Sequence, residues 1–151
     1  TKPGSFGNLP AGEAFLAPVE GTAEGTLILE WAPTGKLRHP VELTVKNGRV
    51  AAVTGKDALA KYLQDRIEDN PLCGNIAELG IGTNEKAKRP DNILETEKIL
   101  GTVHIALGDN SSFGGKVSVP FHEDFIFYRP TLEVIKGDEK IEILVDGKPR
   151  F

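Results

Sequence analysis

The chain has 151 residues, a length that suits one domain with a hydrophobic core of its own. Its net charge of -4 comes from dispersed acids and bases without a basic stripe, which argues against nucleic acid as a partner. No apolar run approaches the ~20 residues that cross a bilayer, so no membrane partner is expected. A single cysteine, Cys73, fits a reducing compartment, and we expect a cytoplasmic protein.

The first half of the chain predicts hairpins and one helix. Residues 1–12 have the glycine and proline content of a loop, and strands are then expected at 13–19, 25–31, 41–45 and 49–53. The last two flank Asn47-Gly48, a pair that suits the positive φ angles of a type I′ turn. Between Lys56 and Glu68, apolar side chains recur at three- and four-residue spacing, which predicts an amphipathic helix packed on a sheet.

The second half predicts further strands. Apolar runs at 75–82 and 101–108 indicate buried strands, separated in part by a polar loop at 83–92. Residues 131–135 and the alternating segment from Glu142 predict a second hairpin around the turn 136–139. The fold class is therefore α+β, mainly antiparallel β-sheet with hairpins and one clear amphipathic helix.

Polar residues interrupt both of these apolar runs and also the segment Ser118–Tyr128. His122 and Asp124 form an HxD pair, and in an extended strand their side chains leave the same face, as metal ligands on a strand do. His104 and Glu78 stand inside the other two runs, where an unpaired imidazole or carboxylate is costly. Each could instead bond a backbone group or face solvent. Their joint occurrence favours one polar pocket formed by all of these side chains.

The amino-acid sequence around these residues resembles the carboxy-terminal part of the aminopeptidase T/aminopeptidase S family of metallo-aminopeptidases, in its leucyl aminopeptidase-like branch. The blocks that carry the resemblance are Gly7–Pro18, Ile76–Asn84, Ile93–Asn110 and the HxD pair, in the family's order. The resemblance implies a site with two divalent ions, zinc, cobalt or manganese, that removes amino-terminal residues from peptides. It also implies that residues 1–151 are one metal-bearing domain, that an amino-terminal domain is missing, and that the protein is a homodimer.

By this likeness the metal ligands are Glu13, Glu78, His104, His122 and Asp124. In the hydrolytic interpretation Glu78 or Asp124 bridges the two ions, which lower the pKa of a water and polarise the substrate carbonyl. Glu97 is the candidate general base and, with Glu78, completes the catalytic pair. The missing amino-terminal domain would supply part of the wall of the active-site pocket. We therefore expect this chain alone to be a weak enzyme.

The sequence departs from the family where a tyrosine ligand is usual, because that position is Ser111, with Asp109 or Asn110 as candidate replacements. A related branch resembles the non-haem iron dioxygenase that opens 2,5-dihydroxypyridine. His104, His122 and Asp124 would equally form its Fe(II) set of two histidines and one carboxylate. A third interpretation is a structural or dimerisation domain without metal. Metal content separates the three interpretations. The aminopeptidase requires two metal ions per chain, the dioxygenase requires one iron ion, and the structural domain requires none.

Overall fold

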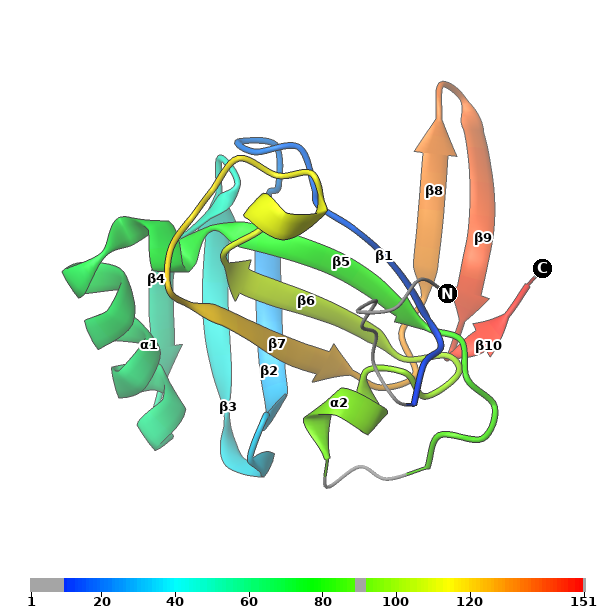
Figure 1. Cartoon of the computed structure of the whole chain (residues 1–151), viewed down its shortest axis with the longest axis horizontal. Coiled ribbons are helices and arrows are strands. Elements are labelled where there is room, and N and C mark those ends of the chain that lie inside the picture. The colour runs from blue at the N-terminus through cyan, green and yellow to red at the C-terminus, as the bar shows by residue number, and fades with distance from the viewer. Residues whose placement is uncertain (1–9, 89–91, 151) are drawn as a thin grey trace, which may run out of the picture.

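The computed structural model describes residues 10–88 and 92–150 (Figure 1). Its strands are β1 (Glu13–Leu16), β2 (Gly25–Ala32), β3 (Gly35–Lys46), β4 (Arg49–Gly55), β5 (Ile76–Gly82), β6 (Val103–Gly108), β7 (His122–Phe127), β8 (Leu132–Lys136), β9 (Glu139–Val145) and β10 (Lys148–Pro149). The helices are α1 (Ala58–Asp69) and the short α2 (Ile93–Thr96), with 3-10 turns at Pro71–Gly74 and Ser111–Phe113.

Antiparallel pairing builds three sheets in the described part of the chain, with strand orders β1-β5-β6-β7, β2-β3-β4 and β10-β9-β8. Figure 1 shows β2 and β3 running across the direction of β5, β6 and β7, with α1 beside β4 and the β8-β9 hairpin projecting from the rest. The core fills the space between the first two sheets and α1. Its buried members are Leu29, Val41, Leu43, Val45, Val50, Leu59, Ala60, Leu63, Ile76, Leu107 and Phe125.

The predicted class is confirmed in its coarse form, a mainly antiparallel β fold with one helix of substantial length among the described residues. Asn47 and Gly48 have φ angles of 50° and 75°, as the predicted turn requires. The predicted strand 13–19 ends at Leu16, whereas β3 begins at Gly35 and so includes His39, which is exposed. Both predicted hairpins therefore form, with different strand ends.

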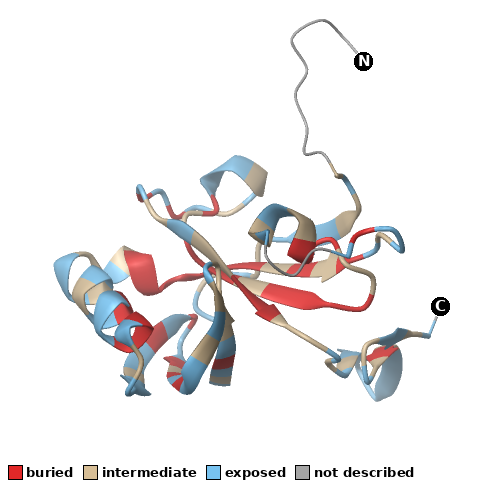
Figure 2. Cartoon of the chain, turned by 90° about the horizontal axis from the view of Figure 1, so that it is seen from below, coloured by how far each residue is buried: buried red, intermediate tan, exposed pale blue. Residues whose placement is uncertain are grey.

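Helix α1 has a narrower apolar face than its spacing predicts. Asp57 caps its start by accepting a hydrogen bond from the backbone N–H of Leu59 at 3.2 Å. Leu59 and Leu63 are buried, but Tyr62 is 38% exposed. The reason is the position of α1 at one edge, where it packs on β4 and on the turn after it. Figure 2 shows the buried residues concentrated in the central strands and the β8-β9 hairpin largely exposed. None of the described helices is long and apolar enough to span a membrane.

Candidate metal centre

Alternation along neighbouring strands places a row of polar side chains on one face of the β1-β5-β6-β7 sheet. Glu78 of β5 lies opposite Ala106 of β6, and Ala106 lies opposite Asp124 of β7. Residues two apart share a face, so His104 and His122 belong to the same side. Ile105 and Leu107 of β6, with Phe125 and Phe127 of β7, point the other way and pack in the hydrophobic core.

Small residues make room for this row. Gly80 is the cross-strand partner of His104, and a Cβ atom at residue 80 would lie 2.0 Å from the His104 Nε2 atom. Ala106 is fully buried and separates Glu78 from Asp124 with a single methyl group. Glycine at position 80 therefore allows the imidazole to lie across the neighbouring strand, as expected where backbone must approach another group closely.

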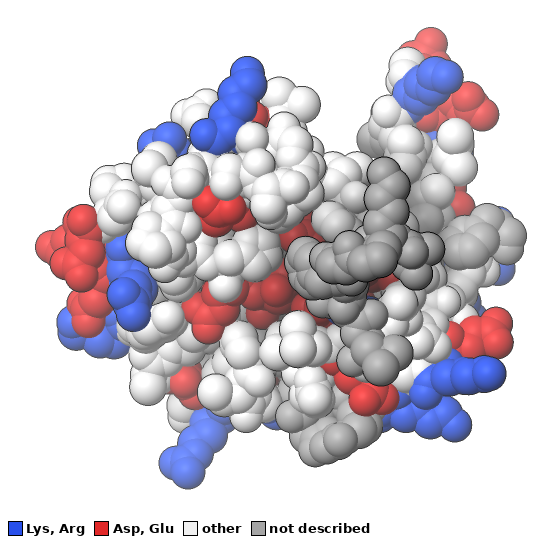
Figure 3. Space-filling view, viewed as in Figure 1, with Lys and Arg blue, Asp and Glu red and all other residues white. Residues whose placement is uncertain are grey.

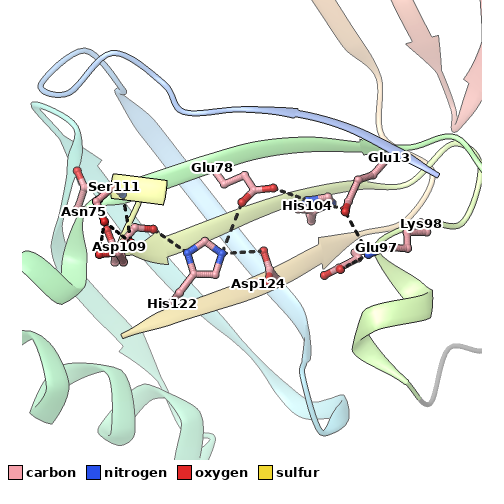
Figure 4. Close-up of polar contacts among 11 residues, drawn as sticks. Glu13, Asn75, Glu78, Glu97, Lys98, His104, Asp109, Ser111, His122 and Asp124 are labelled. Atoms are coloured by element: carbon pink, nitrogen blue, oxygen red, sulfur yellow. Dashed lines mark hydrogen bonds and ion pairs between the residues drawn. The ribbon is translucent and has the colours of Figure 1, made fainter. Parts of the chain in front are cut away.

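Glu78 is the centre of the polar contacts (Figure 4). Its Oε1 atom lies 3.1 Å from His104 Nε2, and its Oε2 atom lies 3.5 Å from His122 Nε2. The same nitrogen of His122 lies 3.7 Å from Asp124 Oδ1. Glu78, His122 and Asp124 each offer a ligand atom, and these atoms lie within 4.8 Å of one another. One ion placed among them could contact all three.

The backbone fixes which nitrogen of His122 faces this group. Its Nδ1 atom lies 2.7 Å from the carbonyl oxygen of Asp109, so Nδ1–H donates there and Nε2 is left toward Glu78 and Asp124. Metal-binding histidines are commonly oriented by such a bond from the second nitrogen. The carboxylate of Asp124 raises the pKa of His122 to about 9, although burial opposes the change. A metal ion must therefore displace a proton at neutral pH.

Neither candidate replacement for the family tyrosine joins the metal-binding group. The carboxylate of Asp109 accepts hydrogen bonds from the backbone N–H groups of Ser111 and Val119, which hold its pKa below the ordinary value. Asn110 is fully buried, and its Oδ1 atom accepts from the N–H of Val117 at 2.9 Å. Both side chains shape the loop that carries the Asp109 carbonyl to His122.

A second set of charges lies beyond His104. Glu13 of β1 has its Oε2 atom 3.7 Å from His104 Nε2 and its Oε1 atom 3.2 Å from the Nζ atom of Lys98. Lys98 also donates to Glu97. The structure thus brings all the predicted ligands and Glu97 into one cluster, with Glu13 and His104 beside the three-residue group. Their role as metal ligands, and that of Glu97 as a general base, stay predictions.

Sequence reasoning missed Lys98, which is fully buried. It follows the short helix α2, where no periodic pattern marks which side chains point inward. Burial alone would lower the pKa of Lys98, but its bonds to Glu97 and Glu13 outweigh burial and raise it. Burial raises the pKa of Glu97, against the opposing effect of Lys98. Burial lowers the pKa of His104, but the bond to Glu78 and the charge of Asp124 raise it overall.

The group opens into a cavity of about 550 Å³ lined by Glu13, Phe15, Glu78, Leu94, Glu97, Lys98, Phe113, His122 and Asp124, among others. The ring of Phe113 meets Phe15 edge to face at 5.6 Å and His122 at 5.9 Å between ring centroids. Figure 3 shows acidic side chains in the middle of this face, surrounded by uncharged surface. The site therefore combines acidic metal-binding groups with an aromatic wall, an arrangement suited to a flat, aromatic ligand.

The donor set fits one divalent ion of the first transition row. Two carboxylates and one imidazole are ligands that Fe(II) and Mn(II) accept, and no thiolate is near, since Cys73 is buried in a different cluster. The bond from His122 Nδ1 to a carbonyl supplies the orienting contact that metal-binding imidazoles require. The arrangement therefore defines a candidate metal site that has free space beside it.

Comparison with known proteins identifies the family. A model of the 2,5-dihydroxypyridine 5,6-dioxygenase (NicX) family matches residues 1–148, and the chain belongs to this family. The chain is 27% identical over 139 residues to 2,5-dihydroxypyridine 5,6-dioxygenase of Pseudomonas putida, covering 82% of the chain and 39% of that protein. It thus spans about two fifths of the length of this relative.

The fold is similar to a solved structure. The match to 2,5-dihydroxypyridine dioxygenase from Pseudomonas putida KT2440 has a TM-score of 0.74 at 23% sequence identity. It covers 89% of this chain and 42% of that one. At this identity the likeness concerns the fold alone.

The family corrects the first interpretation of the sequence. The aminopeptidase assignment was wrong, and with it the peptidase activity, the hydrolase class and the expectation of a peptide substrate. A pair of zinc, cobalt or manganese ions finds no support either, whereas a candidate site for one ion is present. The physical reason is that carboxylates and an HxD pair specify a metal-binding donor set, which hydrolases and dioxygenases can share.

Proposed function

We propose that the protein carrying this chain is a ring-opening dioxygenase that uses one Fe(II) ion and acts on a dihydroxylated pyridine such as 2,5-dihydroxypyridine. The observation that carries the proposal is the group Glu78, His122 and Asp124 at the floor of an aromatic-walled cavity, in a chain of the NicX family. The reaction joins both atoms of O₂ to one ring as a carbon–carbon bond breaks. It therefore needs no external reductant.

The proposed iron ligands are Glu78, Asp124 and the Nε2 atom of His122. When bound, Fe(II) would supply the electron-transfer chemistry that O₂ requires. His104 donates from Nε2 to Glu78 and so fixes the direction of that carboxylate. Asp109 does the same for His122 through its carbonyl oxygen. His104 as a direct ligand is the competing set, in which its bond to Glu78 would be exchanged for one to iron.

The substrate is proposed to lie along Phe113 and Phe15, whose rings line the cavity beside the metal-binding group. A flat heterocycle gains contact area there, and stacking of aromatic rings favours it by ~0.5–1.5 kcal/mol beyond burial. Glu97 and Lys98, which line the same cavity, provide hydrogen-bond partners for ring hydroxyls. The remaining walls of the substrate cavity would come from the rest of a longer protein, so we propose that this chain alone is weakly active.

A homodimer and one domain over residues 1–151 stay predictions.

The test uses the protein at its natural length, loaded with Fe(II) without oxygen and then mixed with 2,5-dihydroxypyridine and O₂. We expect equal molar consumption of substrate and O₂, and no cleavage of aminoacyl-p-nitroanilides. Asp124→Asn should abolish the reaction, whereas Asp138→Asn, in the exposed turn between β8 and β9, should leave it unchanged. An iron-loaded protein that consumes no O₂ with this or related dihydroxypyridines contradicts the proposal.

A second variant tests the aromatic wall. Phe113→Leu keeps an apolar side chain but removes the ring, so we expect KM for the dihydroxypyridine to rise about three- to tenfold with little change in bound iron. Val134→Leu on the exposed face of β8 is the matched control. An unchanged KM in Phe113→Leu would place the substrate elsewhere in the cavity.

A further inference from the structure

Among the residues that the structure describes, the charged residue with the smallest exposed fraction is Lys98, which is fully buried. A buried ammonium is costly unless it is paired and hydrogen-bonded. Lys98 meets this need through two carboxylates, with Nζ 3.2 Å from Glu13 Oε1 and in direct contact with Glu97 Oε1. All three side chains line the same cavity as the metal-binding group.

Lys98 Nζ lies between carboxylate oxygens, which are also ligands of divalent cations. Glu13 and Glu97 supply carboxylate oxygens, and Glu13 also reaches His104 Nε2 at 3.7 Å. His104 in turn contacts Glu78, a member of the proposed iron-binding group. Two-metal enzymes hold their ions about 3.5–4 Å apart, so a carboxylate-rich position in the same cavity as the first ion is where a second ion would bind. Figure 4 shows Lys98 on one side of the His104–Glu78 contact and His122 on the other.

The charge balance agrees with one metal ion. The cavity is lined by the carboxylates of Glu13, Glu78, Glu97 and Asp124, with Lys98 as their fixed cation. One divalent ion together with the ammonium nearly neutralises these four groups. A second divalent ion close to the ammonium would meet strong repulsion, and both of its carboxylate ligands are already occupied.

We propose that Lys98 acts as an internal cation that fills a second metal position and so limits this centre to one divalent ion. The inference rests on the proposed function only in that the first ion lies at Glu78, His122 and Asp124. Lys98 is thus a positioning residue, acting through Glu13 and Glu97. It would help to separate a one-metal oxygenase from the two-metal arrangement that a carboxylate cluster of this kind could otherwise adopt.

The test counts metal ions in the natural-length protein with Mn(II) as the probe. The wild type should bind one Mn(II) per chain and give the spectrum of an isolated ion by electron paramagnetic resonance. Lys98→Met keeps length and volume but removes the charge, so it should bind a second Mn(II) at least about tenfold more tightly than the wild type does. The two ions should then give an exchange-coupled spectrum.

Controls separate charge from folding. Lys98→Arg keeps the cation and should remain at one ion, and Lys61→Met removes an exposed lysine from α1 and should also remain at one. If Lys98→Met does not fold, Lys98→Gln carries the same test, because its neutral amide can still donate to the two carboxylates. Circular dichroism of each variant checks the fold.

The outcomes distinguish this inference from the proposed function. A wild type that binds one ion and a folded, neutral variant that also stops at one would overturn the role of Lys98 alone. Two ions in the wild type would overturn it as well. A wild type that binds no divalent ion would contradict the proposed function itself, and the inference with it.

Discussion

Both faces of the β5-β6-β7 sheet contain residues hidden from solvent, but the two faces differ in chemistry. On β6 and β7, His104 and Phe125 are each 1% exposed, yet one points to the metal-binding group and the other to the core. Burial alone therefore does not distinguish a site from a core in this protein. The distinction lies in the partners: the imidazole bonds a carboxylate, whereas the phenyl ring packs among apolar side chains.

Phe125→Ala should have the largest effect on stability, because it removes a buried ring from the core face of β7. We expect the free energy of unfolding to fall by about 3–5 kcal/mol, measured by urea denaturation of the metal-free protein. Mn(II) affinity of the molecules that remain folded should change less than threefold. A loss below about 1 kcal/mol would mean that the core face is not the main source of stability for this strand.

Asp124→Asn, one residue earlier, should have the opposite effects: a large loss of metal affinity and little change in the stability of the metal-free protein. Removing a charged ligand should weaken Mn(II) binding more than about 100-fold, measured by titration calorimetry, since even supporting contacts around metal ligands are worth 10–100-fold. The stability of the metal-free protein should change by less than about 1 kcal/mol, because Asp124 attracts His122 but also repels Glu97. Unchanged metal affinity would exclude Asp124 as a ligand.

The same contrast explains what could be predicted from the sequence. Hairpins were predictable because alternation and the Asn47-Gly48 pair act locally. Strand ends were not, since the extension of β3 back to Gly35 depends on pairing with β2 across the Trp31–Lys36 region. The HxD pair was visible for the same local reason, because two residues on one strand share a face.

Other parts of the site depend on contacts between distant segments. Nothing near Lys98 in the sequence indicates that its ammonium also pairs with Glu13, since Glu13 comes from β1. The choice between hydrolase and dioxygenase was equally out of reach, because both chemistries use carboxylates and imidazoles around a metal ion. The close approach of His104 to Gly80 likewise joins two different strands, β6 and β5.

Gly80→Ala tests whether the site face depends on small residues as the core face depends on large ones. The new methyl group would lie 2.0 Å from His104 Nε2, so the imidazole must move and lose its bond to Glu78. We expect Mn(II) affinity to fall about 10–100-fold and the free energy of unfolding to fall by ~1–3 kcal/mol.

Gly74→Ala is the matched control, because a Cβ atom there would be 3.4 Å from Ile67, an ordinary packing contact. It should leave metal affinity unchanged. Equal affinity in Gly80→Ala and the wild type would show that the position of His104 does not matter for metal binding.

The smallest expected effect is a pH dependence of stability that the metal-free protein shows and the metal-loaded protein lacks. The folded-state pKa of His122 is about 9, above the ordinary 6.5, so its favourable contribution is fully present below pH 6.5 and is lost as pH rises through 9. The pKa of His104 is displaced in the same direction. Because the His122 side chain is 32% exposed, we expect the loss in the metal-free protein to be only on the order of 1–2 kcal/mol.

Metal binding removes the His122 part of this dependence above pH 6.5, because the bound imidazole is neutral, as it is in the unfolded chain. Mn(II) affinity should therefore rise between pH 6.5 and 9, while the metal-free protein becomes less stable over the same interval. Thermal unfolding with and without Mn(II) measures both. His39→Gln, which removes an exposed histidine from β3, should keep both slopes, whereas His122→Gln should flatten them. Parallel slopes with and without metal would show that His122 is not a ligand, since the metal then fails to compete with its proton.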